Sequence, residues 1–222
     1  METDFTTTVV LSSSVRVARA QPGAPLVIAL HGKGSGPGRL ERRLRPALDR
    51  GGQSWWLPRG ILPYEAESSR IGYAWYAYDG DQRRLRAGMD EARAYLVGLT
   101  ETARRALCPS SVSLLGFSQG GYLASYLALS RPDLYRALVC CCARPKAEFI
   151  ADLGTARRVA VLVQTGRRDT SVPPDLIARG VEPLRVAGLE VTVRSYDVRH
   201  ELTQEMARDA GRFLGGLTRR RR

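Results

Sequence analysis

The chain has 222 residues and a net charge of +12 at neutral pH, with no composition break that would divide it. This length buries a sizeable core, so we expect one domain over residues 1–222. The longest apolar run, Ala137–Ala143, is too short to cross a bilayer, and the first residues carry acids where a signal peptide needs positive charge. We therefore expect a cytoplasmic protein without a transmembrane segment.

The positive charge comes almost entirely from arginine, since Lys33 and Lys146 are the only lysines. The arginines are scattered along the chain, which is typical of a solvated surface and gives no reason to expect a nucleic-acid partner. The exception is the C-terminal end, where residues 219–222 form an all-arginine tail that we expect to be disordered.

Three of the four cysteines, Cys140–Cys142, are consecutive and follow the apolar residues Ala137-Leu138-Val139. Neighbouring side chains of a strand point to opposite faces of the sheet, so these thiols do not pair easily. No histidine or second cysteine pair lies at ligand spacing, so we expect no metal site here. Buried, reduced cysteines account for the pattern.

Along the chain, short apolar runs alternate with longer amphipathic segments, a pattern that predicts an α/β fold with a mostly parallel sheet and helices on both faces. The expected strands are Val9–Ala18, Pro25–Leu30, Gly52–Leu57, Ser111–Phe117, Ala137–Cys142, Val159–Thr165 and Glu190–Tyr196. The expected helices are Arg39–Leu48, Arg83–Leu107, Gln119–Leu129, Pro174–Val186 and Glu201–Leu217.

Ser118 lies between the fourth expected strand and the third expected helix, in the motif Gly116-Phe117-Ser118-Gln119-Gly120. The spacing G-x-S-x-G suits a sharp turn that exposes a nucleophilic serine at the carboxyl end of a strand. The motif alone fits an ordinary turn equally well. A dinucleotide site is a weaker interpretation, because the glycine run His31–Gly36 lacks the Gly-Lys-Ser/Thr ending and no acid closes a following strand.

A serine nucleophile needs a base and a carboxylate that orients the base. His200 follows the last expected strand, and Asp169 follows the strand before it, so both fall at the carboxyl edge of the sheet in the order Ser, Asp, His. The rival acids are Asp152, before that strand, Asp175, inside a helix start, and Asp197, close in sequence to the histidine. We select Asp169; its alternative role is a loop carboxylate paired with a neighbouring arginine.

The loop after the second expected strand, His31-Gly32-Lys33-Gly34, has the composition of an oxyanion loop. The backbone N–H of Lys33 and that of Gln119 are the predicted donors to a developing oxyanion. A glycine-rich turn supported by a hydrogen-bonded His31 is an interpretation that is compatible with this one.

Taken together, these motifs resemble the phospholipase/carboxylesterase family of α/β-hydrolases, the group of bacterial carboxylesterases and acyl-protein thioesterases. The resemblance covers most of the chain and rests on LHGKG at Leu30–Gly34, AWY at Ala74–Tyr76, GFSQGG at Gly116–Gly121, Asp169 with Val172-Pro173, and His200-Glu201. It implies an α/β-hydrolase fold without a large cap domain, and a serine esterase that needs no metal or cofactor.

By the same resemblance, the aromatic pair Trp75 and Tyr76 lines the substrate groove, although ordinary core packing is an alternative for both. Two features depart from the family. Arg199 stands where a glycine often precedes the histidine, and Cys140–Cys142 replace a serine-glycine turn. An inward-pointing Arg199 would lower the basicity of His200, whereas we expect a surface arginine.

Only the segment Pro58–Asp81 is long enough to cover the site in part, so we expect an open groove for esters or thioesters of short or medium acyl chains. From another class, the alternative is a noncatalytic protein of this fold that binds an anionic partner. Among enzymes, a dienelactone-type hydrolase would usually carry a cysteine nucleophile, and a peptidase a larger capping insertion. The sequence leaves the oligomeric state open between monomer and homodimer.

Overall fold

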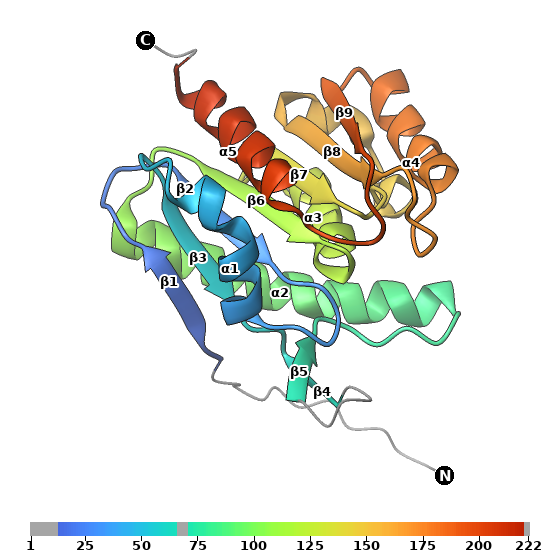
Figure 1. The fold of residues 1–222 in the computed structure, drawn as a ribbon, viewed down its shortest axis with the longest axis horizontal. Coiled ribbons are helices and arrows are strands. Elements are labelled where there is room, and N and C mark those ends of the chain that lie inside the picture. Colours follow the sequence, from blue (N-terminus) through green and yellow to red (C-terminus); the bar gives the residue numbers. More distant parts are fainter. Residues whose placement is uncertain (1–12, 66–70, 220–222) are drawn as a thin grey trace.

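The computed structural model describes residues 13–65 and 71–219 (Figure 1). The strands are β1 (Val15–Arg19), β2 (Leu26–Leu30), β3 (Ser54–Pro58), β4 (Leu62–Glu65), β5 (Ile71–Ala74), β6 (Val112–Phe117), β7 (Ala137–Cys141), β8 (Ala160–Gly166) and β9 (Val191–Tyr196). The α-helices are α1 (Pro37–Leu48), α2 (Gln82–Leu107), α3 (Gln119–Ser130), α4 (Pro174–Val186) and α5 (Gln204–Arg219), and two short 3₁₀ helices, η1 (Ala147–Phe149) and η2 (Leu153–Arg158), follow β7.

The main sheet has seven strands in the order β1-β3-β2-β6-β7-β8-β9. All neighbours are parallel except β1, which pairs with β3 in the antiparallel direction. The central strands β2, β6, β7 and β8 are almost wholly buried, as expected of parallel strands that are covered on both faces. The predicted α/β fold with a mostly parallel sheet is confirmed.

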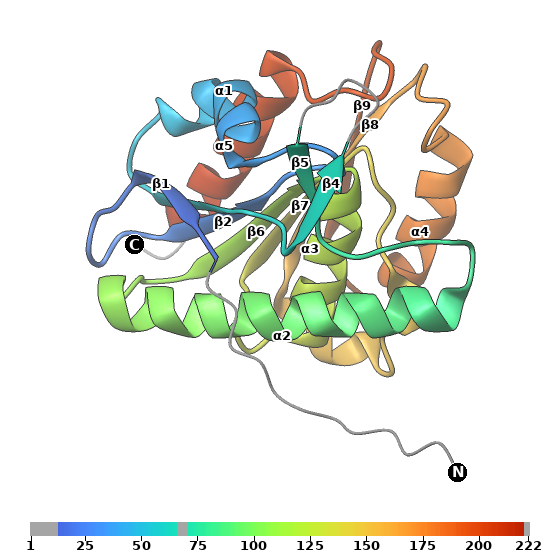
Figure 2. The same cartoon turned by 90° about the horizontal axis from the view of Figure 1, so that it is seen from below.

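Two helical layers cover the sheet, as Figure 2 shows. Helices α1 and α5 lie together on one face, over a core that includes Leu44 and Met206. Helices α2, α3 and α4 cover the other face, where Leu96, Leu123 and Leu184 are fully buried. This arrangement leaves the carboxyl ends of the parallel strands at a common edge, where the loops carry the candidate site residues.

The turn between β6 and α3 is unusually tight, because backbone atoms of neighbouring segments occupy the space that side chains at Gly116 and Gly120 would fill. A Cβ atom on Gly116 would lie 2.1 Å from the carbonyl oxygen of Gly120, and one on Gly120 would lie 2.4 Å from the carbonyl oxygen of Leu30. Ser118 itself adopts φ 52° and ψ −121°, which an L-residue rarely does. The strained turn is held by the glycines on either side and by the hydrogen bond from the Ser118 N–H to Cys141 O (2.9 Å).

The segment Pro58–Asp81, expected only as a partial cover, contains the antiparallel hairpin β4–β5. The hairpin is joined to the loop after β2, where the N–H of Gly34 donates to Tyr73 O (3.0 Å) and the N–H of Tyr73 donates to Ser35 O (2.8 Å). This contact braces the loop that carries Lys33.

Several expected boundaries differ from the structure by a few residues, and two of these differences concern the last helix. Helix α5 begins at Gln204 and not at Glu201, because the Thr203 hydroxyl accepts a hydrogen bond from the N–H of Met206 (3.3 Å) and thereby caps the helix. Arg219, expected to start the disordered tail, ends α5. Residues 220–222, and the first part of the expected strand Val9–Ala18, lie outside the described residues.

Candidate functional site

Three side chains from three different loops meet at the carboxyl edge of the sheet. His200 Nε2 lies 2.8 Å from Ser118 Oγ, and His200 Nδ1 lies 2.7 Å from Asp169 Oδ2. An ionised carboxylate only accepts hydrogen bonds, so Nδ1 carries the proton and Nε2 is left to accept from the serine hydroxyl. The arrangement is thus able to remove the hydroxyl proton from Ser118 during an attack on an electrophile.

The Asp169 carboxylate is held from both sides. Its Oδ1 accepts from the N–H groups of Ser171 (2.9 Å) and Val172 (2.8 Å), while Oδ2 faces His200. With only 3% of the residue exposed, these backbone donors replace water and fix the carboxylate that orients the imidazole.

Each rival carboxylate has a different partner. Asp152 caps η2 by accepting from the N–H of Gly154 (2.8 Å). Asp175 pairs with Arg179 (3.6 Å), and Asp197 pairs with Arg168 (3.0 Å); both of these acids are exposed. The structure brings Asp169, and none of the three rivals, to His200.

The loop after β2 is organised around a buried histidine. His31 Nδ1 lies 2.8 Å from Gly32 O, and the Gly60 N–H donates to Nε2 (3.0 Å), so the imidazole carries its proton on Nδ1. Burial lowers the pKa of His31 to about 4, against the opposing effect of the Gly32 hydrogen bond. A neutral His31 thus supports the loop at neutral pH, the role that the sequence had offered as compatible with an oxyanion loop.

The two predicted backbone donors border the same space. Lys33 and Gln119 both line a cavity that also contains Ser118 and His200. The N–H of Gln119 is the first of α3, and the first N–H groups of a helix have no acceptor inside it. Within residues 13–65 and 71–219, the N–H of Lys33 donates to no backbone carbonyl. Both groups are thus available to a ligand oxygen.

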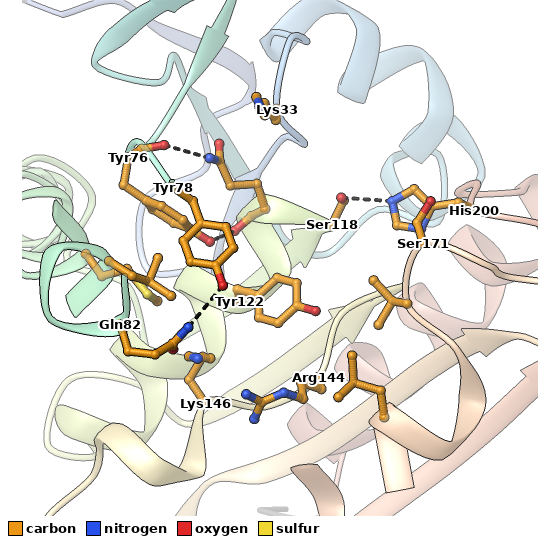
Figure 3. A pocket seen from close by; sticks show the side chains of 15 residues that line it. Lys33, Tyr76, Tyr78, Gln82, Ser118, Tyr122, Arg144, Lys146, Ser171 and His200 are labelled. Atoms are coloured by element: carbon orange, nitrogen blue, oxygen red, sulfur yellow. Dashed lines mark hydrogen bonds between the residues drawn. The ribbon is translucent and has the colours of Figure 1, made fainter. Parts of the chain in front are cut away.

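Trp75 and Tyr76 are held by the Gln119 side chain. Gln119 Oε1 accepts from the N–H of Trp75 (3.0 Å), and its Nε2 donates to Tyr76 O (2.8 Å). Trp75 is fully buried, and its indole N–H donates to His31 O (2.7 Å), so it lies behind the loop after β2 and does not line the cavity beside Ser118. Tyr76 does line the cavity (Figure 3).

Two cavities reach Ser118 and His200. The larger, of about 470 Å³, has apolar side chains in its wall, including Leu85, Met89 and Leu176. The smaller, of about 290 Å³, is lined by residues of α1 and by those that follow His200. Ser118 and His200 thus border both cavities.

The cysteine run is buried, as expected, and all four thiols are free. Cys142 follows β7 in a left-handed conformation (φ 47°), and its Sγ lies 3.4 Å from Glu201 O. Its sulfur, an Asp169 oxygen and a His200 nitrogen lie within 4.8 Å of one another, so the fold brings together a possible ligand set that the sequence spacing had argued against. Burial, followed by the charge of Asp169, raises the pKa of Cys142 to about 12, which opposes metal binding by the thiolate.

Arg199 is exposed, in agreement with the expected surface position, and its carbonyl accepts from the N–H of Glu201 (2.9 Å). The sequence did not identify several cavity residues, namely Tyr78, Gln82, Tyr122, Arg144, Lys146 and Ser171. Arg144 and Lys146 had a usable signal, because they lie in the segment that follows β7 and therefore fall at the carboxyl edge of the sheet.

The parallel sheet, the tight strand-to-helix turn at Ser118 and the polar side chains at the carboxyl edge define an α/β-hydrolase fold. The chain belongs to the phospholipase/carboxylesterase family, whose profile matches residues 12–217. Membership in this family supports hydrolase activity.

A curated relative is "Putative esterase NocK" from Nocardia uniformis subsp. tsuyamanensis, which is 35% identical over 146 residues. The match covers 60% of this chain and 40% of that protein, so this chain accounts for less than half of the relative's length.

Among solved structures, esterase PE8 is similar with a TM-score of 0.76 and 23% identity, over 93% of this chain and 99% of that one. Zea mays acyl-protein thioesterase 2 gives a TM-score of 0.74 and 20% identity, over 92% and 99% of the two chains. At these identities the likeness establishes the shared fold. Among the described residues, no helix is both long and apolar enough to span a membrane.

Protonation of His31 is predicted to destabilise the protein. Its pKa is about 4 when folded and 6.5 in the reference state, so the unfolded chain binds more protons between these values and stability falls as pH falls through this window. The loss approaches about 3 kcal/mol. Urea unfolding across this pH range should show a steeper loss for the wild type than for His31→Gln, and parallel profiles would contradict the account.

Proposed function

We propose that the protein is a serine carboxylesterase that cleaves carboxylic esters or thioesters through an acyl-enzyme, with Ser118, His200 and Asp169 as catalytic residues. The observation that supports this most is the continuous chain from Ser118 Oγ to His200 (2.8 Å) and on to Asp169 (2.7 Å). Family membership adds an independent argument for hydrolysis.

In the first half-reaction, Ser118 Oγ attacks the substrate carbonyl carbon while His200 Nε2 takes the hydroxyl proton. Asp169 stabilises the imidazolium through the Nδ1–H bond. The N–H groups of Lys33 and Gln119 donate to the oxyanion, and each such donor is typically worth about 3 kcal/mol in the transition state. His200 then gives its proton to the leaving alcohol or thiol, whose bond to the carbonyl carbon breaks.

In the second half-reaction, a water molecule attacks the acyl-enzyme as His200 takes its proton. The tetrahedral intermediate collapses, the bond to Ser118 Oγ breaks, and His200 returns the proton to the serine. The acid is released and the starting state is restored. No step requires a metal or cofactor.

We further propose that residues 1–222 act as one domain, that Tyr76 contacts the substrate, and that Trp75 supports the oxyanion loop from behind. The two hydrogen bonds of Trp75, to Gln119 and to His31, favour this supporting role for its indole and backbone. The rival function, noncatalytic binding of an anionic partner, does not explain why Ser118 and His200 are aligned.

Ser118 is predicted to be the site of covalent modification by a fluorophosphonate. Intact-mass measurement should show one phosphonyl group on the wild type and none on Ser118→Ala, because only an activated serine attacks the phosphorus. The wild type should also hydrolyse p-nitrophenyl butyrate, with the variant slower by at least about a thousandfold. A folded wild type that neither labels nor hydrolyses would leave the binding protein as the leading alternative.

Short and medium acyl chains are predicted to be the best substrates. The cavity beside Ser118 has a volume of about 470 Å³, which accommodates a limited chain. In a series of p-nitrophenyl esters from acetate to palmitate, kcat/KM should peak before the long chains. A clear maximum at palmitate would refute the assignment.

A further inference from the structure

Within the described part of the chain, the larger cavity beside Ser118 is lined by positively charged residues without a negatively charged one. Three cationic residues, Lys33, Arg144 and Lys146, take part in its lining. No carboxylate belongs to the lining among the described residues. In a cleft with partly apolar walls, an unbalanced positive charge attracts anions more strongly than it would in open water.

Arg144 and Lys146 share a single counter-ion that stands outside the cavity. The Arg144 guanidinium donates to both oxygens of Glu148 (2.9 and 2.6 Å), and Lys146 Nζ lies 2.6 Å from Glu148 Oε1. Burial opposes ionisation of Glu148, but the hydrogen bonds from both cations hold its pKa at about 2. One carboxylate therefore faces two cations, and the cluster keeps an excess positive charge.

Lys146 is unusual because its charge is buried. Only 4% of its side chain is exposed, and Nζ lies 4.2 Å from the centroid of the Phe149 ring. An ammonium group has three N–H donors, whereas the described part of the chain offers it one carboxylate, that of Glu148. A buried cation with spare donors, on the wall of a cavity that opens to Ser118, suits an anionic ligand group.

The cavity also holds an apolar stretch. Leu85, Met89, Val172 and Leu176 line it, and in Figure 3 Tyr122 lies between Ser118 on one side and Arg144 on the other. Methylene groups would contact these apolar side chains, while a charged end would meet Arg144 and Lys146. The tyrosine hydroxyl adds a neutral hydrogen-bonding group to the same wall.

From this arrangement we infer that the preferred substrates are esters whose acyl chain ends in a carboxylate, which Arg144 and Lys146 bind while Ser118 attacks the ester carbonyl. The inference rests on the proposed esterase function and adds the charge of the acyl group to it. Arg144 and Lys146 are specificity-determining residues in this account.

The test compares isosteric esters that differ in charge. The charged substrates are the mono-p-nitrophenyl esters of adipic and suberic acid. The neutral ones are the p-nitrophenyl esters of adipamic and suberamic acid, in which a carboxamide replaces the carboxylate. For at least one chain length, the wild-type kcat/KM should favour the carboxylate about tenfold, as expected of one charge-assisted hydrogen bond. In Arg144→Gln and Lys146→Gln this ratio should fall toward unity.

Arg131→Gln is the matched control. Arg131 also donates two hydrogen bonds to one carboxylate, that of Asp133 (2.8 and 2.6 Å), but it follows α3 and stands outside the cavity. This variant loses the same charge and should keep the wild-type ratio.

Equal kcat/KM values for carboxylate and carboxamide in the wild type would overturn the inference while leaving the esterase function intact. A preference that survives both cavity variants, or that Arg131→Gln abolishes equally, would overturn it as well. If one variant fails to fold, the wild-type ratio and the other variant decide. Turnover of none of the esters, with no fluorophosphonate adduct, would remove the proposed function and this inference together.

Discussion

The site depends first on one strained backbone turn. Ser118 occupies a conformation that costs free energy (φ 52°). The turn can form because Gly116 and Gly120 have no side chain, which at either position would collide with backbone atoms. The turn lifts Oγ above the end of β6 and leaves the first N–H of α3 without an intrahelical acceptor. The proposed nucleophile and one of the proposed oxyanion donors, Ser118 and Gln119, are thus consecutive residues of the chain.

The other groups are held by elements that pack against this turn. The loop after β2, which carries Lys33, is braced by the β4–β5 hairpin and by His31, while Gln119 joins α3 to Trp75 and Tyr76. Two backbone N–H groups fix the Asp169 carboxylate that also contacts His200. Most of these contacts are hydrogen bonds to buried backbone groups. The side chains of the site are therefore held in place before a ligand binds.

Sequence patterns predicted the sheet, its helices and the positions of Ser118, Asp169 and His200, because strand ends in a parallel sheet meet at one edge. They did not predict the β4–β5 hairpin, whose short strands lack a clear alternation, nor the start of α5, which depends on the Thr203 cap. The position of Arg144 and Lys146 after β7 indicated the carboxyl edge of the sheet, but periodicity does not show which side chains at that edge face a cavity.

In the proposed reaction, Ser118 carries the acyl group between the two half-reactions. The most direct measurement is acid-quenched mass spectrometry with p-nitrophenyl trimethylacetate, a crowded ester whose acyl-enzyme hydrolyses slowly. We expect one trimethylacetyl group on the peptide that contains Ser118, and none in Ser118→Ala. Hydrolysis without an acyl adduct, or an adduct on another residue such as the exposed Cys108, would contradict it.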